Sequence, residues 1–493
     1  MGELLSHRLR IVNPARRKEG SLRPMGWPEA LAGVLEAAQG RGILLFLDAN
    51  LPCEQLVAAD AWCRAWPSAR LCLVMEPGDE QMLLGAEAAA AEHLSDEALA
   101  DCDGFLIVGD AFAANPRCSR GVFERRAAEP RTPIVAIDPG GGTAAKFATH
   151  CVPAAPGAEL QALASVALAA GIDMDVSGLC GAGETPASAA GKALAGCRRL
   201  GVLLAAEYGR TSAWRQVGYL AGRLAAARGG GVACQTAGAN ALGAVRCAAG
   251  LETVPLAEAV ADEASAWVVL GCDLLGMLGW CDRAVLAAAA PLPNTTTEAA
   301  EFVLPAPLPV EMGGTYVLSG GRQVASQALL APPAGVATPL EIIEQMARSA
   351  GVASPEVPGI AAALEARPAE APELVAAEGD PGQPLLLFAR QALHAGSGAL
   401  TRHGSWQQGA EGRMELRVSP ADADEMDLRN LQAARVEAGG RSAAAQVRVS
   451  DGLPGGAVVL PEGFVEARAL APCRAEADRN ALVATPAAVK IEA

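Results

Sequence analysis

Short apolar runs recur along most of this chain, and segments with helical spacing separate them. The runs at residues 42–47, 70–75, 104–108 and 133–137 show almost no alternation of polar and apolar residues. That pattern is typical of strands buried on both faces of a parallel sheet. Because strand and helix alternate with short loops, the sequence predicts a doubly wound α/β domain.

A second α/β section begins near residue 199, with apolar runs at 201–205 and 267–270. In both sections a strand is followed by a Gly-Asp or Gly-x-Asp step, which suggests two related halves. We therefore expect two doubly wound parallel-sheet lobes. The expected divisions are an irregular lead at 1–25, a dinucleotide-binding-like α/β domain at 26–170, a second α/β domain at 171–351, a linker at 352–383 and a β domain at 384–493.

The C-terminal part has a different pattern. Pro, Ala and Glu dominate residues 352–384, which is typical of a linker. Beyond it, strand-like segments at 414–418, 432–438, 443–449 and 456–460 are separated by Gly, Asp and Pro turns. This spacing predicts a compact β domain.

Charge and composition exclude several classes of partner. The 493 residues carry a formal net charge of −16, and they are 51% hydrophobic but only 4% aromatic. An acidic chain argues against nucleic acid and against an anionic membrane surface as partners. It does not argue against small anionic ligands, because local groups hold these.

Membrane and secretory signals are not expected. No run reaches the roughly 18 apolar residues that cross a bilayer. Residues 1–23 contain scattered basic residues with no following apolar region, which does not fit a secretory signal. We therefore expect a cytoplasmic chain that does not itself span a membrane.

The 13 cysteines are dispersed in apolar settings and include no CxxC pair. This pattern favours buried, reduced thiols over a zinc or iron–sulfur site. With only five histidines, the chain is poor in groups for metal or acid–base chemistry. We expect no iron–sulfur cluster and no metal ligand in this chain.

The predicted sheets indicate where binding residues should lie, because ligands of such sheets sit beyond the carboxyl ends of the strands. The corresponding tips are residues 48–50, 109–111, 138–142 and 271–273. Among them Asp273 is the strongest candidate, since an acid at a buried strand tip needs a partner.

A glycine-rich turn near the C-terminus is a further candidate. It follows the apolar strand 385–388 and contains His394, Ser397, Thr401 and Arg402. Backbone N–H groups, hydroxyls and a basic side chain in such a turn can hold a phosphate or the edge of a pterin. An ordinary connection between two strands explains the same residues equally well.

The most specific pattern is a block of motifs late in the second α/β section. It reads "EAAEFVLP" at 298–305, "EMGGTY" at 311–316 and "GR" at 321–322, and "AGANALGA" stands earlier, at 237–244. This combination resembles the molybdopterin-dependent oxidoreductase superfamily, the group of DMSO reductase and formate dehydrogenase. Over residues 22–493 the chain is most similar to the C-terminal part of the large iron–sulfur subunit of NADH:quinone oxidoreductase (complex I).

The resemblance implies a cleft for molybdopterin guanine dinucleotide between the α/β lobes, closed by a C-terminal six-stranded β barrel of the double-psi type. By position, Asp138 would face one guanine and Asp273 would be the matching group in the other half. A carboxylate suits this role because it accepts two N–H donors of a guanine edge. The cofactor-binding residues implied in this way are Gly109, Asp138, Gly271, Asp273, His394, Ser397, Thr401 and Arg402, with no catalytic residue.

The sequence departs from the family in the parts that carry its chemistry. The clustered cysteines of the family's iron–sulfur domain are not found, and residues 76–82 offer no thiol or hydroxyl where catalytic members place a metal ligand. Both departures argue against catalysis. The Gly-x-Asn-Pro loop is changed at 109–112, with its Asn-Pro pair at 115–116, and 271–274 lack the usual proline. These changes argue against tight dinucleotide binding.

Three functions therefore stay open from the sequence. The first is an accessory or scaffold subunit of a multisubunit NADH-, formate- or hydrogen-linked redox complex, whose partner subunits carry flavin and iron–sulfur clusters. The second is an active molybdenum or tungsten bis-pterin oxidoreductase similar to formate dehydrogenase. The third is an unrelated α/β ligand-binding protein or hydrolase, although the sequence has no G-x-S-x-G nucleophile elbow.

Overall fold

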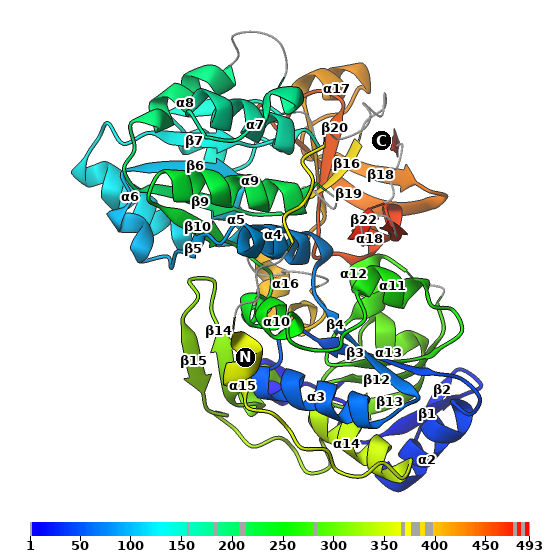
Figure 1. Ribbon diagram of the computed structural model, residues 1–493. Helices are drawn as coiled ribbons and strands as arrows, with labels where there is room; N and C mark the ends of the chain where they lie inside the picture. Colours follow the sequence, from blue (N-terminus) through cyan, green and yellow to red (C-terminus); the bar gives the residue numbers. More distant parts are fainter. Residues whose placement is uncertain are drawn as a thin grey trace.

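Three parts make up the molecule, two built on parallel sheets and one on a mixed C-terminal sheet (Figure 1). The N-terminal sheet forms the lower lobe in this view, and the other two parts lie side by side above it. The computed structural model describes residues 2–154, 157–180, 186–206, 213–280, 283–365, 370–375, 385–389, 398–476, 481–484 and 489–492.

The first sheet has seven strands: β1 (Ala15–Lys18), β2 (Ser21–Pro24), β3 (Ile43–Asp48), β4 (Ala69–Val74), β11 (Ala266–Leu270), β12 (Val285–Ala290) and β13 (Ala300–Pro305). Their order is β2-β1-β13-β12-β11-β3-β4. The five strands from β13 to β4 are parallel, whereas β1 and β2 are added antiparallel at one edge. Residues 44–47 of β3 are fully buried, as expected for a strand covered on both faces.

Helices cover both faces of the first sheet. One face packs against α2 (Trp27–Ala37), α3 (Cys53–Ala65) and α14 (Pro339–Ser349). The opposite face packs against α11 (Leu256–Ala261), α12 (Leu274–Leu278) and the hairpin of β21 (Cys473–Glu476) and β22 (Ala481–Ala484). Alternate side chains of β3 enter these two cores, with Leu45 in one and Phe46 in the other.

The second sheet has six strands: β5 (Glu92–His93), β6 (Gly104–Val108), β7 (Ile134–Ile137), β8 (His150–Val152), β9 (Leu200–Leu204) and β10 (Gly231–Cys234). All its pairs are parallel, in the order β5-β10-β9-β6-β7-β8. One face packs against α4 (Pro77–Ala88), α7 (Glu159–Ala169), α8 (Pro186–Ala195) and α9 (Trp214–Ala227). The other face packs against α5 (Ala111–Ala114) and α6 (Cys118–Ala128).

The prediction of two doubly wound parallel-sheet lobes is confirmed, but the lobes are not consecutive along the chain. The chain leaves the first sheet after β4, forms the second sheet from β5 to β10, and returns at β11. The expected boundary between 26–170 and 171–351 therefore does not separate the two sheets. Strand periodicity is a local signal, whereas the partners of β3 and β4 lie far along the chain.

The lead at 1–25 is not irregular throughout. It contains α1 (Gly2–Leu5) and the β1–β2 hairpin, which pairs with the edge strand β13. The hairpin strands read ARRK and SLRP, so no apolar pattern marks them. Unpaired backbone groups at the sheet edge explain why such a polar segment becomes a strand.

The C-terminal part contains a six-stranded sheet in the order β16-β20-β17-β19-β18-β23, with both parallel and antiparallel pairs. Its strands are β16 (Leu385–Ala389), β17 (Glu415–Val418), β18 (Ala433–Ala438), β19 (Arg441–Val449), β20 (Ala457–Pro461) and β23 (Lys490–Glu492). Three helices accompany it: α16 (Ser405–Glu411), α17 (Pro420–Glu425) and α18 (Val465–Leu470). The predicted six-stranded β domain is thus confirmed, while its double-psi closure stays a prediction.

The remaining elements connect these parts. They are α10 (Ala241–Ala248), α13 (Thr295–Ala299), the hairpin of β14 (Gly314–Val317) and β15 (Gln323–Ser326), α15 (Ile360–Leu364) within the expected linker, and the 3-10 turns η1 (Ala98–Asp101), η2 (Ala144–Phe147), η3 (Ser177–Leu179), η4 (Pro309–Glu311) and η5 (Thr401–His403). None of the helices in the described part of the chain has the length and apolar character that a bilayer crossing requires.

Candidate functional site at the carboxyl ends of the sheets

The carboxyl edge of the first sheet is organised by Asp273. This residue follows β11 and caps α12, where its carboxylate accepts hydrogen bonds from the Gly276 N–H (3.3 Å), the Thr296 N–H (2.9 Å) and the Thr296 hydroxyl (2.8 Å). Asp273 therefore has the partners that an acid at a buried strand tip needs. Gly276 and Thr296 of the same chain provide these partners.

Gly271, two residues earlier, has a backbone conformation that favours glycine, with φ at +88°. A Cβ atom at this position would lie 3.2 Å from the Asp48 Cβ atom on the neighbouring strand. The glycine thus permits a tight turn and a close approach between β11 and β3.

The second sheet repeats this arrangement. Gly109 follows β6 with φ at +78°, and a Cβ atom there would lie 2.1 Å from the Ala205 carbonyl oxygen. Asp110 then caps α5 and accepts hydrogen bonds from the N–H groups of Ala113 (3.2 Å) and Ala144 (3.0 Å). The related halves suggested by the Gly-Asp steps are therefore visible as two glycine turns, each followed by a helix-capping aspartate. Gly109 was predicted as a cofactor-binding residue from the sequence, whereas Asp110 was not.

Asp138 follows β7 on the same edge. Its carboxylate accepts hydrogen bonds from the Gly140 N–H (2.9 Å) and the Gly142 N–H (2.7 Å). Burial, followed by the nearby charge of Asp110, raises the pKa of Asp138 to about 6. The amides that could bind a pyrophosphate in this glycine-rich loop are therefore occupied by the chain's own carboxylate.

A second buried acid lies close to Asp138. Glu159, at the start of α7, is only 2% exposed, and one of its carboxylate oxygens has no hydrogen-bond partner among the described residues. Burial raises the pKa of this group to about 7. Glu159 was not predicted from the sequence, because one glutamate at a helix start is also typical of an exposed first turn.

The C-terminal domain closes the edge of the second sheet. Gly141, at the tip of the Asp138 loop, lies against Gly452, so that a Cβ atom on Gly141 would come within 2.2 Å of the Gly452 backbone. The neighbouring Leu453 is buried. Backbone packs directly on backbone here, which leaves no space for a ligand between the two loops.

A small cavity of about 170 Å³ is present at the edge of the first sheet. Gly271 and Asp273 line it together with Asp48, and Ala399 and Leu400 of the C-terminal part form another wall. Desolvation raises the pKa of Asp48 to about 6, against the hydrogen bonds from Asn50. Pockets for drug-sized ligands usually measure roughly 300–1,000 Å³, so this cavity is small even for one half of a pterin dinucleotide.

The remaining predicted residues fall into two groups. Thr401 donates its hydroxyl hydrogen to the Gly398 carbonyl (3.4 Å), and Arg402 donates to the Gly463 carbonyl (2.8 Å) while its guanidinium lies 3.5 Å from the centre of the Phe464 ring. Both side chains therefore stabilise the C-terminal part. His394 and Ser397 lie outside the described residues. Gly109 and Asp138 share the edge of the second sheet, and Gly271 and Asp273 share that of the first.

A buried ion-pair cluster stands at the position where the resemblance places a metal ligand. Arg468, on α18, is fully buried, and its Nη1 lies 3.0 Å from a carboxylate oxygen of Glu76, just after β4. The same guanidinium donates to the Met277 carbonyl (2.9 Å) and the Glu462 carbonyl (2.7 Å), and it lies 3.5 Å from the Glu462 carboxylate. Arg468 thereby joins the C-terminal domain to the first sheet.

This cluster was not predicted as a unit. The absence of a thiol or hydroxyl at 76–82 indicated a changed position, but nothing in the sequence pairs Glu76 with a residue almost four hundred positions later. An arginine within the largely apolar segment 464–473 was the available signal, because such a residue is seldom buried without a partner.

Asn240, in the motif at 237–244, has a structural role. It is fully buried and donates to the Leu51 carbonyl (2.6 Å), while its amide oxygen accepts from the Val317 N–H (2.8 Å). It therefore joins α10, the β3–α3 loop and the β14–β15 hairpin. Among the described residues, no group of three or more His, Cys, Asp or Glu side chains is arranged to hold a metal ion.

Comparisons with known proteins identify the fold. No protein-family model and no curated protein sequence matches this chain. Among solved structures, acetylene hydratase from Pelobacter acetylenicus is similar, with a TM-score of 0.69 over 99% of this chain and 93% of that one, at 13% sequence identity. The narrower resemblance to the complex I subunit stays a prediction. At this identity the likeness shows a shared fold, and membership of the molybdopterin oxidoreductase superfamily also stays a prediction.

Proposed function

We propose that this chain is an accessory or scaffold subunit of a multisubunit NADH-, formate- or hydrogen-linked redox complex. In this proposal it keeps the molybdopterin oxidoreductase fold without a metal centre of its own. Partner subunits carry the flavin and the iron–sulfur clusters, and the complex resides in the cytoplasm. The observation that carries the proposal is the Glu76–Arg468 ion pair.

The Glu76–Arg468 pair argues against a metal at this position for an energetic reason. A buried guanidinium is costly unless carboxylates and carbonyls surround it, and removing one partner leaves an uncompensated charge. Glu76 and Glu462 supply these carboxylates. A metal ligand at Glu76 would have to give up this partner, and the cation would then lie beside the metal.

The described residues also do not fit a bound pterin dinucleotide. Asp138 accepts a backbone hydrogen bond on each carboxylate oxygen, and Asp273 accepts its hydrogen bonds on Oδ1, so both carboxylates are oriented by loops of the chain itself. Gly452 packs on the loop at the second sheet, and the cavity at the first sheet measures only about 170 Å³. A scaffold role requires none of these sites.

The test is to purify the tagged full chain from its own cells and to analyse the material for subunits and metals together. Mass spectrometry should find partner subunits, and the absorption spectrum should show flavin and iron–sulfur bands that disappear when the partners are stripped away. Molybdenum and tungsten should stay far below one atom per chain. Stoichiometric molybdenum or tungsten that stays with this chain, or a preparation without partner subunits, would contradict the proposal.

An active molybdenum or tungsten bis-pterin oxidoreductase is the second candidate, and the fold likeness is the observation that favours it. In that case a pterin guanine dinucleotide would have to displace the Gly141–Gly452 contact. The same metal analysis separates the two candidates.

A further inference from the structure

A second cavity lies at the opposite, amino edge of the first sheet. It has a volume of about 580 Å³, and the first residues of three parallel strands line it: Ala266 of β11, Val285 of β12 and Ala300 of β13. The size is within the roughly 300–1,000 Å³ of small-molecule pockets. Of the cofactor-binding residues that the resemblance implies, none that the structure describes lines this cavity.

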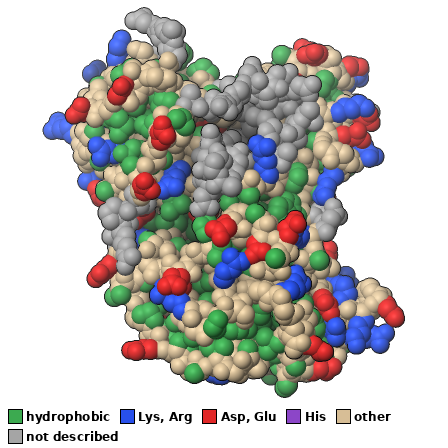
Figure 2. All heavy atoms as spheres, turned by 45° about the vertical axis from the view of Figure 1, so that its right-hand side comes forward, with side chains coloured by type: hydrophobic (Ala, Val, Ile, Leu, Met, Phe, Trp, Pro, Cys, Tyr) green, Lys and Arg blue, Asp and Glu red, His purple; other side chains and the backbone are tan. Residues whose placement is uncertain are grey.

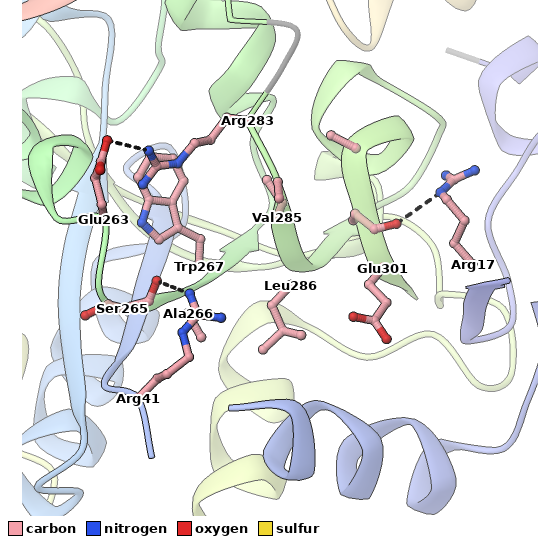
Figure 3. A pocket seen from close by; sticks show the side chains of 13 residues that line it. Arg17, Arg41, Glu263, Ser265, Ala266, Trp267, Arg283, Val285, Leu286 and Glu301 are labelled. Atoms are coloured by element: carbon pink, nitrogen blue, oxygen red, sulfur yellow. Dashed lines mark hydrogen bonds and ion pairs between the residues drawn. The ribbon is translucent and has the colours of Figure 1, made fainter. Parts of the chain in front are cut away.

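Three arginines surround this cavity. Figure 3 shows Arg41 and Arg283 on one side and Arg17 on the other, with Val285 and Leu286 between them. The arginines come from three separate segments: the β1 strand, the loop before β3 and the loop before β12. Their convergence is therefore a product of the tertiary structure.

Backbone carbonyls hold Arg17 and Arg41 in place. Arg17 donates through Nε to the Ala300 carbonyl (3.2 Å) and through Nη2 to the Thr297 carbonyl (3.0 Å). Arg41 uses the same two nitrogens for the carbonyls of Ala264 (3.2 Å) and Ser265 (2.9 Å). A guanidinium has five N–H donors. The Nη1 group of each arginine thus keeps donors with no partner among the described residues.

Arg283 is oriented in a related way. Its guanidinium carbon lies 4.4 Å from the centre of the Trp267 ring, and it donates to the Asp262 carbonyl (3.3 Å). Its acidic neighbour Glu263, 3.4 Å away, is 82% exposed. A charge that is so well hydrated compensates the guanidinium only weakly.

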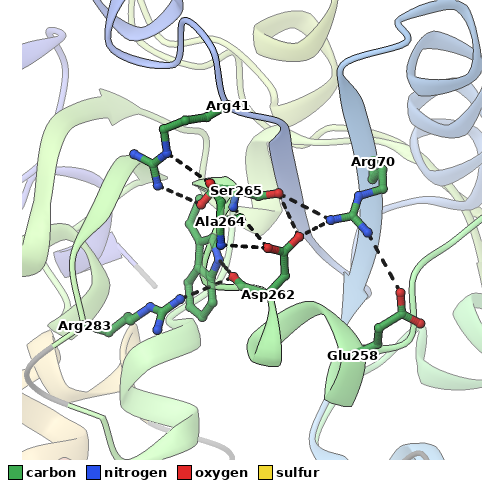
Figure 4. A network of polar contacts seen from close by, with 8 residues as sticks. Arg41, Arg70, Glu258, Asp262, Ala264, Ser265 and Arg283 are labelled. Atoms are coloured by element: carbon green, nitrogen blue, oxygen red, sulfur yellow. Dashed lines mark hydrogen bonds and ion pairs between the residues drawn. The ribbon is translucent and has the colours of Figure 1, made fainter.

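A polar network makes this arrangement rigid (Figure 4). The Asp262 carboxylate accepts hydrogen bonds from the Ser265 hydroxyl (2.8 Å) and the Ala264 N–H (2.9 Å), and it pairs with Arg70. Burial raises the pKa of Asp262, but these hydrogen bonds outweigh that effect and lower it overall. The loop whose carbonyls hold Arg41 and Arg283 is therefore fixed before any ligand binds.

The charge of the lining is positive in an acidic protein. The other carboxylate at the cavity, Glu301, is paired with Arg16 at 2.7 Å. Lys and Arg side chains lie among Asp and Glu side chains at the lower right of the molecule in Figure 2, whereas the whole chain has a net charge of −16. Fixed guanidinium groups with spare donors match the geometry of phosphate oxygens.

We propose that this cavity binds a small molecule that bears a phosphate or pyrophosphate group, with Arg17, Arg41 and Arg283 as its cationic contacts. Val285 and Leu286 provide an apolar surface for the rest of the ligand. A concave pocket with donors converging from several sides suits a compact anion better than an extended acidic peptide. The binding would give the scaffold subunit a regulatory or structural ligand at the edge opposite the family's cleft.

The test is calorimetric titration of the full chain with inorganic pyrophosphate at low ionic strength. We expect saturable binding at one site that weakens as salt is added. The double variant Arg17→Gln/Arg41→Gln should lose about tenfold or more in affinity, because contacts to charged groups are lost. Melting curves establish that each variant is folded, and Arg41→Gln alone, at an exposed side chain, serves if the double variant is not.

The matched control is Arg23→Gln, which removes the same charge from the same hairpin at a side chain that is 65% exposed and outside the cavity. Its affinity should equal that of the parent chain. The proposal is overturned if pyrophosphate does not bind, if Arg23→Gln loses as much affinity as the cavity variants, or if polyglutamate binds at the cavity and pyrophosphate does not.

Discussion

Charged side chains at the two edges of the first sheet have different partners. At the carboxyl edge, Asp273 accepts hydrogen bonds from two backbone N–H groups and one hydroxyl, and Arg468 is enclosed by Glu76 and Glu462. At the amino edge, Arg17 and Arg41 are held by carbonyls on one side only. The first edge has a cavity of about 170 Å³ and the second one of about 580 Å³.

This difference follows from what covers each edge. The C-terminal domain packs on the carboxyl ends of both sheets, and charges taken out of water need partners within the protein. No such cover lies over the described residues of the amino edge, so its arginines keep contact with solvent. Parallel-sheet folds normally bind ligands at the carboxyl edge. In this protein, contacts between its own parts occupy that edge.

The largest effect is expected from Arg468→Leu. The substitution leaves Glu76 and Glu462 without their buried partner, and breaking such a pair costs about 3–5 kcal/mol. The free energy of unfolding in urea measures this loss. Arg120→Leu is the control, because Arg120 makes an ion pair with Glu124 at a side chain that is 83% exposed, and such pairs contribute little to the free energy of unfolding. Equal losses in both variants would mean that the buried ion-pair cluster at the carboxyl edge stabilises the fold no more than an exposed ion pair does.

A second substitution sharpens this test. Glu76→Gln in the Arg468→Leu background removes one of the carboxylates left uncompensated. It should recover part of the lost stability, because the two residues contact each other and their effects are not additive. No recovery would indicate that Arg468 acts through its carbonyl contacts instead.

Gly141→Ala should break the closure of the second sheet. The new Cβ atom would lie 2.2 Å from Gly452, at a position with φ of +59°. We expect a loss of about 2–4 kcal/mol, since overpacking is added to backbone strain. Faster proteolysis of the C-terminal domain would report its release.

Gly20→Ala is the matched control for Gly141→Ala. Gly20 has a φ of +78°, but nothing lies within 4 Å of its Cβ position. It should lose only about 1 kcal/mol from the strained backbone. If both variants behave alike, the contact with Gly452 does not hold the C-terminal domain.

Glu159→Gln should change the pH dependence of stability. Burial raises the folded-state pKa of Glu159 from 4.5 to about 7, so the folded chain holds this proton more tightly than the unfolded chain. The resulting stabilisation is complete below about pH 4 and is lost as the pH rises to about 7. Glutamine stays neutral, so the variant should be more stable than the parent at about pH 8, by about 1–3 kcal/mol.

Urea midpoints measured from about pH 5 to about pH 8 check this prediction. The exposed Glu36 provides the control, because Glu36→Gln should leave the pH profile of the parent unchanged. A Glu159→Gln profile that runs parallel to that of the parent would show that this carboxyl does not titrate in this range.

The smallest effect is expected from Arg41→Gln. The side chain is exposed and loses two hydrogen bonds to carbonyls that solvent can reach, so the loss in unfolding free energy should be below about 1 kcal/mol. The same urea titration measures it beside Arg468→Leu. A loss comparable to that of Arg468→Leu would remove the contrast between the two edges.

The local features of this protein could be predicted from its amino-acid sequence. Apolar runs such as 104–108 became strands buried on both faces, and Gly109 and Gly271 mark the turns that follow β6 and β11. Side-chain periodicity and glycine conformations depend on a few neighbouring residues, so they can be predicted from the sequence.

How these features combine could be seen only once the chain was folded. It assigned β3 and β4 to the sheet of β11, paired Glu76 with Arg468, and brought Arg17, Arg41 and Arg283 around one cavity. Such pairings join residues that are hundreds of positions apart, and they depend on which buried charges find partners when the lobes pack together. A local sequence pattern does not indicate which distant residues will form such pairs.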